Sequence, residues 1–211
     1  MTGFSAALRA ATWTDHQRAE DTAYLRALVS GGVDRHGYAE MVAQHWYAYL
    51  VLEEAAQVMR DDPVAGVFVT PALDRVPALE RDLAALLGPE WSTVVSPSPA
   101  TRRYCDRLRE VCFGWPGGFV AHHYTRYLGD LSGGQFLGRS IERWLGPGIT
   151  AFYDFSGLGD LSAFKEAYRR ALDETGWSAE EQERVIAETA LAYTLNTAVL
   201  HELTGEKVKF S

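Results

Sequence analysis

Four residues near the N-terminus have types and a spacing that suit a bound cofactor. Arg9, Trp13, His16 and Glu20 follow one another at steps of three or four residues, so they share one face of an α-helix. Glu20 lies one turn after His16, where its carboxylate can accept a hydrogen bond from the imidazole and fix the tautomer of a ligating histidine. A lone helical histidine is more often an ordinary surface or core residue. With a cation two turns back, the stripe indicates a flat, anionic, metal-centred cofactor.

Glycine is concentrated in a second segment of the chain. Eleven of the 19 glycines lie between Gly114 and Gly159, and four of these interrupt an otherwise helical stretch: Gly129, Gly133, Gly134 and Gly138. Each internal glycine costs a helix about 1 kcal/mol relative to alanine. A loop or close helix packing would explain any single one of them. Four within ten residues predict a kinked helix whose backbone is approached closely by another group.

Several common catalytic and metal-binding motifs are missing from the sequence. It contains no GxxxxGK[ST], no GxGxxG after a strand, no HExxH and no CxxC. No histidine has a glutamate three residues before it, which excludes the Glu-x-x-His pattern of di-iron bundles. His122 and His123 are adjacent, so on a helix they point about 100° apart and cannot chelate one metal together.

The rest of the chain must build the elements that position these residues. Apolar residues recur at helical steps in five further segments, residues 38–60, 76–87, 100–111, 161–172 and 180–203. Glycine- and proline-rich stretches separate the segments, and Ser98 and Ser178 stand at N-cap positions. No alternating β-branched run bounded by hairpin turns appears. The pattern predicts an all-α fold of seven to nine helices in a single domain over residues 1–211.

Composition and charge narrow the class of function. The 211 residues are 47% hydrophobic and 23% charged, a globular balance that excludes wholesale disorder. The formal net charge of −8 argues against nucleic acid as a partner, because that role needs a basic face. No signal peptide or long apolar run is present, so we expect no membrane anchor and a cytoplasmic location. Cys105 and Cys112 would lie too far apart on one helix for a disulfide, which fits a reducing compartment.

The glycine-rich segment also carries the most specific signal. The run from His122 to Gln135 contains RYLGDLSGGQ and resembles the signature of the haem oxygenases. The resemblance extends from about residue 4 to 204 and includes the segments around His16, Tyr49 and Asn196 and residues 164–169. It implies an all-α bundle in which haem lies between a proximal helix and a glycine-kinked distal helix. It also implies that haem b is both cofactor and substrate, opened with O2 to biliverdin, carbon monoxide and ferrous iron.

The resemblance implies a role for each matching position. His16 would be the iron ligand and Glu20 its hydrogen-bond partner. Asp130 would be the catalytic carboxylate, acting through ordered water in a polar network with Tyr49 and Arg126. The remaining cofactor-binding positions are Arg9, Tyr124, Lys165 and Arg169 for the propionates and Gly129, Ser132 and Gly133 on the distal helix. Lys165 and Arg169 are one helical turn apart, a spacing that suits a shared propionate site.

Two departures from the family pattern accompany the resemblance. Asp160 stands where some bacterial relatives carry a further lysine, which predicts a propionate clamp with one cation fewer. The C-terminus, TGEKVKFS, lacks the apolar tail that anchors animal members.

The sequence also bears on the partners of such an enzyme and on the alternatives. Without a flavin or nicotinamide motif, electrons must come from an external donor, either ferredoxin with its reductase or a flavoprotein reductase. A haem carrier or sensor without turnover is a second interpretation, against which Asp130 argues, because a carrier needs no acid there. A cofactorless helical enzyme, or plain helical packing, is a third. Iron acquisition and bilin supply are both compatible purposes, and the resemblance favours attack at the α meso carbon.

Overall fold

The computed structural model describes residues 3–204, which form nine α-helices and no β-strand. The α-helices are α1 (Phe4–Glu20), α2 (Ala23–Ser30), α3 (Arg35–Met59), α4 (Val76–Leu87), α5 (Pro99–Val111), α6 (Pro116–His123), α7 (Gly129–Leu145), α8 (Leu161–Asp173) and α9 (Ala179–Leu203). Short 3-10 turns occupy Ala65–Phe68, Pro71–Leu73, Trp91–Thr93, Ala151–Tyr153 and Ser156–Leu158. The prediction of an all-α fold is confirmed, and both ends of each of the five predicted segments lie within three residues of the ends of an observed helix.

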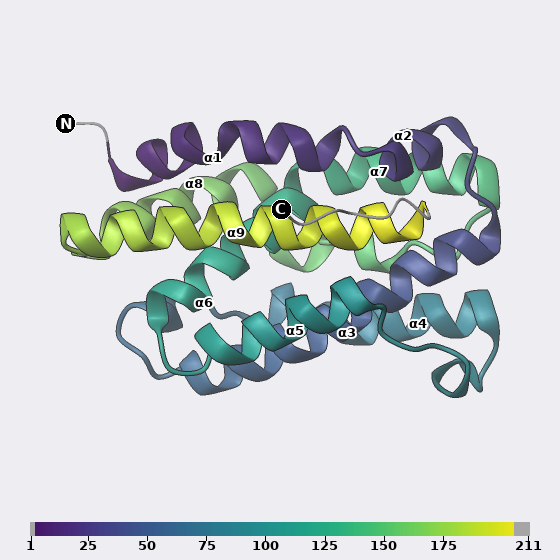
Figure 1. Ribbon diagram of the computed structural model, residues 1–211, viewed down its shortest axis with the longest axis horizontal. Coiled ribbons are helices and arrows are strands. Elements are labelled where there is room, and N and C mark those ends of the chain that lie inside the picture. The colour runs from purple at the N-terminus through teal and green to yellow at the C-terminus, as the bar shows by residue number, and fades with distance from the viewer. Residues whose placement is uncertain (1–2, 205–211) are drawn as a thin grey trace.

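The helices pack in two layers (Figure 1). One layer contains α1, α8 and α9 side by side, and α2 and α7 continue it toward the opposite end of the bundle. The other layer contains α3, α4 and α5, with α3 packed against both of its neighbours. Helix α6 packs against α9 and leads the chain from the second layer into α7. This arrangement brings the first helix of the chain and the glycine-rich segment into the same layer.

Large buried side chains from both layers hold this arrangement in place. Leu8 of α1, Tyr49 of α3, Leu79 of α4 and Leu108 of α5 are all almost completely buried. Fully burying one leucine stabilises a fold by about 1.5–3 kcal/mol relative to leaving it exposed. The buried core therefore fixes α1 relative to α3, the two helices that carry His16 and Tyr49.

The expected N-caps begin their helices as the sequence predicts. Ser98 Oγ accepts a hydrogen bond from the Thr101 backbone N–H at 3.2 Å, and Ser178 Oγ accepts one from the Glu181 N–H at 3.2 Å. Each bond satisfies a backbone donor that the first helical turn leaves free. The bounds of α5 and α9 therefore follow from local sequence.

The glycine-rich segment is a long, nearly continuous run of helix with its irregularity in an unexpected place. A π-helix, Tyr124–Leu128, joins α6 to α7 directly. The four glycines lie at and after the start of α7, where the helix is regular. The helical hydrogen-bonding pattern changes just before Gly129, and the kink expected at the glycines stays a prediction. Such π-helical turns occur frequently at functional sites.

The two cysteines form no disulfide bond. Cys105 and Cys112 are both buried free thiols, and burial raises the pKa of Cys105 to about 11.

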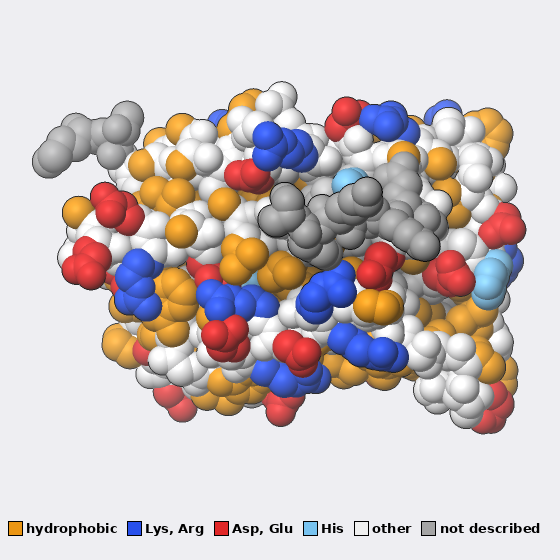
Figure 2. Space-filling view, in the orientation of Figure 1, with side chains coloured by type: hydrophobic (Ala, Val, Ile, Leu, Met, Phe, Trp, Pro, Cys, Tyr) orange, Lys and Arg blue, Asp and Glu red, His pale blue; other side chains and the backbone are white. Residues whose placement is uncertain are grey.

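None of the described helices combines the length and the apolar composition that a membrane crossing requires. The expected lack of an apolar C-terminal tail concerns residues that lie mostly outside the described range. Figure 2 shows acidic and basic side chains interspersed over one face of the molecule.

Candidate functional site

A cleft with two connected parts lies between α1 and α7. The inner cavity has a volume of about 480 Å³ and the outer cavity about 700 Å³. They are lined in common by His16, Glu20, Gly129 and Tyr193. Most of the surface of the inner part is apolar, and its arginines, Arg26 and Arg126, are matched by Glu20 and Asp130. The outer part is lined by Arg9 and Arg169 with Glu20 as the single carboxylate among its described residues. The cleft therefore has an apolar end and a cationic end.

His16 is the residue of α1 that lies between these two parts. Its Nδ1 lies 3.4 Å from Glu20 Oε2, within ion-pair distance but outside hydrogen-bond geometry. Its Nε2 forms no hydrogen bond with any residue of the described chain. Trp13 stacks parallel to the imidazole with 5.4 Å between ring centroids, and Tyr193 of α9 meets it edge-on at 5.7 Å. The ring is held from two sides while one nitrogen stays available to a ligand.

The four glycines of α7 divide into two pairs with different surroundings. At Gly129 and Gly133 an added Cβ would meet no atom within 4 Å, and both residues line the inner cavity. At Gly134 and Gly138 a Cβ would come within 2.9 Å and 3.2 Å of Tyr153. Open space beside the backbone is therefore found at the first pair, the two glycines that the resemblance places against the haem. The second pair makes room for a side chain of the protein itself.

Asp130 lies in the first turn of α7 and meets the predicted polar partners. Tyr49 donates a hydrogen bond to Asp130 Oδ2, and the Arg126 guanidinium lies 4.8 Å from the centre of the Tyr49 ring. Arg126 Nη1 donates to Asn196 Oδ1, while its Nε and Nη2 are buried without a partner among the described residues. Burial raises the pKa of Asp130, and the nearby Arg126 charge opposes that rise.

The cationic end of the cleft gathers most of the predicted propionate ligands. Arg9 and Tyr124 line the outer cavity together with Ser132 and Arg169. Lys165 lies one turn before Arg169 on α8 but lines neither cavity. The Ser5 backbone N–H donates to Asp173 Oδ1 at 2.7 Å, which ties the start of α1 to the end of α8. This bond keeps Arg9 and Arg169 beside the same cavity.

Asp160, the departure from the family pattern, has a local structural role. Its Oδ1 accepts hydrogen bonds from the Ser162 and Ala163 backbone N–H groups at 2.8 Å and 3.1 Å. It is therefore the N-cap of α8, the helix that carries Lys165 and Arg169. An aspartate N-cap stabilises a helix by roughly 1 kcal/mol, which a lysine in its place would not provide.

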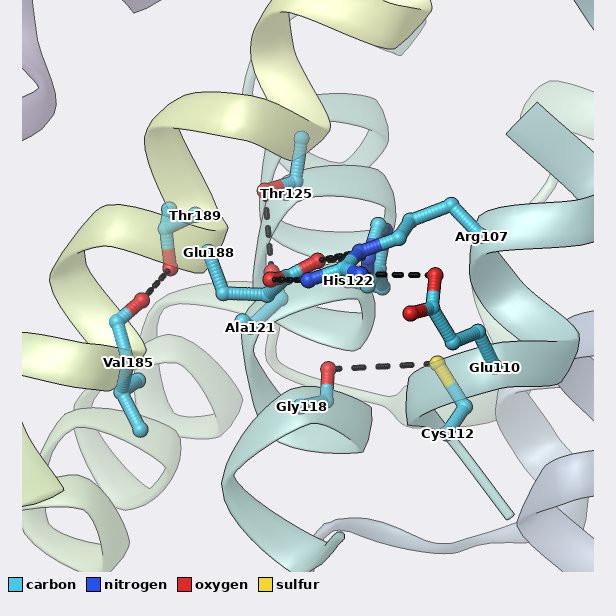
Figure 3. Close-up of polar contacts among 10 residues, drawn as sticks. All are labelled: Arg107, Glu110, Cys112, Gly118, Ala121, His122, Thr125, Val185, Glu188 and Thr189. Carbon is cyan, nitrogen blue, oxygen red and sulfur yellow. Dashed lines mark hydrogen bonds and ion pairs between the residues drawn. The ribbon is translucent and has the colours of Figure 1, made fainter. Parts of the chain in front are cut away.

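A buried ionic cluster lies behind the site, where α5, α6 and α9 meet (Figure 3). The Glu188 carboxylate accepts two bonds from Arg107, at 2.9 Å and 2.5 Å, and lies 3.0 Å from His122 Nε2. Burial alone would raise the pKa of Glu188, but these hydrogen bonds outweigh it and lower the pKa to about 2. Burial lowers the pKa of His122, so the neutral ring donates its Nε2 proton. The cluster anchors α6 directly before the π-helix.

The paired histidines are structural rather than available as ligands. His122 is engaged with Glu188, and His123 Nδ1 lies 2.9 Å from the Tyr168 hydroxyl. Neither residue lines the inner or the outer cavity. No group of three or more metal-ligating side chains occurs within residues 3–204. The histidines that line the inner cavity are His16 and His45.

Sequence reasoning missed two aromatic residues that the structure brings into the cleft, and it considered His45 only as an alternative iron ligand to His16, beside His122 and His123. Tyr193 and Tyr153 line the inner cavity from α9 and the 3-10 turn at Ala151–Tyr153, and His45 lines it from α3. Their apolar neighbours give them the pattern of core residues, so spacing alone could not separate them from the core. Trp13 was placed on the correct helix face but not assigned to the site.

Comparison with known proteins agrees with this geometry. The family model described as Heme oxygenase matches residues 2–202. "Heme oxygenase 2" of Synechocystis is 37% identical over 96% of this chain and 84% of its own length. A crystal structure of Synechocystis heme oxygenase-1 in complex with heme superposes with a TM-score of 0.92 at 34% identity, covering 97% of this chain and 93% of that one.

A third relative comes from a different bacterial group. The structure of heme oxygenase from Leptospira interrogans has a TM-score of 0.90 at 32% identity and covers 95% of this chain and all of that one. The match thus extends over nearly the whole length of each protein, and it includes both helices that form the walls of the cleft. This chain belongs to the haem oxygenase family.

Proposed function

We propose that this haem oxygenase binds haem b in the cleft and opens it with O2 to biliverdin, carbon monoxide and ferrous iron. One observation carries the proposal. A free imidazole nitrogen of His16 lies in a cleft whose other wall is the bare backbone at Gly129 and Gly133. A histidine opposite a helix whose backbone is bare at two glycines suits a flat, iron-centred ring better than a globular ligand.

The two ends of the cleft also fit haem. Haem is a flat ring with two anionic propionates at one edge and apolar methyl and vinyl groups around the rest. Arg9 and Arg169 line the outer cavity, where they can pair with the propionates. The apolar walls of the inner cavity suit the methyl and vinyl edge. When bound, haem supplies the iron that activates O2 and the ring that is oxidised.

His16 and Glu20 would hold the iron from the proximal side. With Nδ1 directed toward the Glu20 carboxylate, the imidazole presents Nε2 to the iron. A neutral histidine ligand avoids the strong electron donation of a thiolate, which favours O–O bond cleavage. Trp13, stacked on the ring, and Tyr193, at its edge, keep the imidazole plane fixed.

Asp130 would hold and release a proton on the distal side. Its raised pKa keeps the carboxyl protonated at a higher pH than an exposed aspartate. The bond from Tyr49 engages Oδ2 and leaves Oδ1 for an ordered water in the cleft. Arg126 lies next to this pair and limits how far the pKa rises. Delivery through water gives one proton to the cleft without placing a charged side chain directly on the reacting oxygen.

The electrons are proposed to come from a separate ferredoxin or flavoprotein reductase in the cytoplasm. The chain has no motif for binding flavin or nicotinamide, and the opening of the outer cavity carries basic side chains. Acidic electron carriers would be attracted to such an opening.

The test compares two histidine–glutamate pairs of the same spacing and distance, in which Nδ1 of His16 and Nε2 of His36 face the carboxylate. His16 and Glu20 are four residues apart at 3.4 Å, and so are His36 and Glu40, which lie outside both cavities. We expect haemin titration to give a saturable absorption spectrum in the parent chain and in His36→Ala. His16→Ala should lose that spectrum and turnover, and free imidazole should restore part of the spectrum.

Turnover is then measured with ferredoxin and its reductase, or with ascorbate, and the bilin is identified by chromatography. Biliverdin from the parent chain and from His36→Ala, but not from His16→Ala, is the expected result. Haem binding without any bilin would instead indicate a carrier or sensor. A parent-like spectrum in His16→Ala without imidazole would move the iron ligand to another residue.

A further inference from the structure

The inner cavity contains two polar groups that the proposed chemistry does not use. His45 of α3 and Tyr153 both line it, among side chains that are mostly apolar. Neither His45 Nε2 nor the Tyr153 hydroxyl forms a hydrogen bond with any residue in the described part of the chain. Polar groups in protein interiors are almost always hydrogen-bonded, to protein or to ordered water. Two such groups in one cavity therefore indicate a polar ligand within it.

The tautomer of His45 is set by its own helix. Its Nδ1 lies 2.8 Å from the Met41 carbonyl oxygen, which can only accept, so Nδ1 carries the proton. Burial, together with the positive charge of Arg126, lowers the pKa of His45 to about 3. The ring is therefore neutral, and Nε2 is an acceptor.

Tyr153 supplies a donor that is equally fixed in position. Its ring packs against the backbone of α7 where Gly134 and Gly138 leave room. The buried Asp82 carboxylate accepts the backbone N–H groups of Ala151 and Phe152 at 2.8 Å and 2.9 Å, which holds the turn beneath the ring. The phenol keeps its proton, because burial raises its pKa well above the usual value.

Phe152 connects these two groups to Asp130. Its ring contacts His45 at 5.6 Å, Tyr153 at 4.9 Å and Tyr49 at 5.5 Å between centroids. Tyr49 in turn donates to Asp130. The three polar side chains thus surround one aromatic ring at the distal end of the cavity.

We propose that His45 Nε2 and the Tyr153 hydroxyl hold an ordered water in the inner cavity, and that His45 is a positioning residue for proton delivery by Asp130. The tyrosine O–H donates to the water, and the water donates one O–H to His45 Nε2. Its second O–H is then left to point toward the Asp130 side. His45 Nε2 can only accept a hydrogen bond, so it neither gives a proton to the water nor takes one from it. Its role is to fix the orientation of the water.

This inference rests on the proposed function, but its first test does not. Imidazole 15N spectra of the apo-protein should show His45 as the Nδ1-protonated tautomer from pH 5 to 9. Tyr153→Phe should shift the His45 Nε2 resonance, because it removes the hydroxyl that orders the water while keeping the ring that packs on Phe152. Tyr47→Phe is the matched control, since the Tyr47 hydroxyl donates to the Val95 carbonyl outside both cavities. An Nε2-protonated ring, or no shift in Tyr153→Phe, would overturn the proposal.

The second test uses the haem-loaded enzyme with His45→Leu and His45→Gln. The leucine variant should bind haem within twofold of the parent and unfold at the same or a higher urea concentration, because an apolar group replaces an acceptor without a protein partner. Its single-turnover rate of biliverdin formation should fall about tenfold, less than the roughly 100-fold or more expected for a group that transfers the proton itself, because His45 acts only through the water. Glutamine places an amide near Nε2 and should recover most of the rate.

Two outcomes in these variants would overturn the proposal. One is a His45→Leu rate equal to that of the parent. The other is a parent spectrum typical of two histidine ligands that becomes a one-histidine spectrum in His45→Leu, since His45 would then bind the iron itself. Absence of biliverdin from the parent chain would count against the proposed function alone, and the apo-protein spectra would still decide the water site.

Discussion

Asp130 and Glu188 are two carboxylates at the same long run of helix from α6 to α7, but their surroundings differ. Asp130 belongs to α7, and Glu188 of α9 contacts His122 of α6. Glu188 accepts two bonds from Arg107 and one from His122, and these lower its pKa to about 2. Asp130 has one bond, from Tyr49, and burial raises its pKa although Arg126 is close. The Glu188 carboxylate is charged and has three hydrogen-bond partners, whereas the Asp130 carboxyl has a raised pKa and one partner.

We infer that Glu188 serves the stability of the fold, whereas Asp130 serves the proposed chemistry. A buried charge with all its partners in place holds helices together, and removing a partner is costly. A carboxyl that is only partly satisfied costs stability but can take up and release a proton. Residues 116–123 therefore serve as the anchor and residues 129–145 as the working part, with the π-helix between them.

The largest expected effect comes from removing the anchor. Glu188→Ala leaves the Arg107 guanidinium and the buried His122 without their partner, and we expect the free energy of unfolding to fall by about 3–5 kcal/mol. Urea denaturation measures the loss. Glu110→Ala is the matched control, because Glu110 also pairs with Arg107, at 2.7 Å, but is 66% exposed; it should cost less than about 1 kcal/mol.

The same anchor predicts a pH dependence with a definite sign. The folded pKa of Glu188 lies below its usual value of 4.5, so its stabilisation is present above that pH and is lost as pH falls toward 2. The stability difference between the parent chain and Glu188→Ala should therefore narrow in acid. A difference that stays constant from pH 7 to pH 3 would contradict the ionic role of Glu188.

Replacing Asp130 should lower the rate of biliverdin formation and leave the stability of the protein unchanged. Asp130→Asn keeps the shape of the side chain but removes the exchangeable proton, so biliverdin formation should fall at least about 100-fold. Haem affinity and the urea midpoint should not fall, because the carboxyl is destabilised by burial in the first place. A variant that loses stability and haem binding together would assign Asp130 to the same structural class as Glu188.

The smallest expected effect sharpens the comparison with a third carboxylate. Glu53 accepts the backbone N–H groups of Arg75 and Val76, and burial raises its pKa to about 7. Glu53→Gln keeps the acceptor oxygen without the charge. We expect the variant to be more stable than the parent by about 1 kcal/mol at pH 8, with the gap opening between pH 4.5 and 7. A gap independent of pH would show that charge burial is not the cause.

The sequence predicted those parts of the molecule that depend on local order. The helix predicted from periodicity over residues 76–87 has the same bounds as α4. The residues from Arg9 to Glu20 that were expected on one helix face all line the outer cavity from α1. The N-caps at Ser98 and Ser178 follow from the first turn of each helix. The family signature supplied Asp130, and the structure brings Tyr49 and Arg126 to it.

What could not be predicted depends on contacts between distant segments. The bond between Arg107 and Glu188 joins residues on α5 and α9, and no spacing rule relates them. Gly134 and Gly138 looked like part of a ligand-facing row, but Tyr153 from a later turn occupies the space beside them. His45 has the periodicity of a core residue, and only its unused nitrogen in the cavity sets it apart.

The packing of α1 against α9 has a consequence for how the protein is made. His16 leaves the ribosome near the beginning of synthesis, whereas its neighbour Tyr193 and the Arg126 partner Asn196 emerge close to the end. At about 5–20 residues per second, these segments are separated by roughly 10–40 s of translation. The nascent chain therefore carries an exposed histidine but no finished pocket for most of that time. A chain released before α9 would lack Tyr193 and Asn196, and with them the contacts that fix His16 and Arg126.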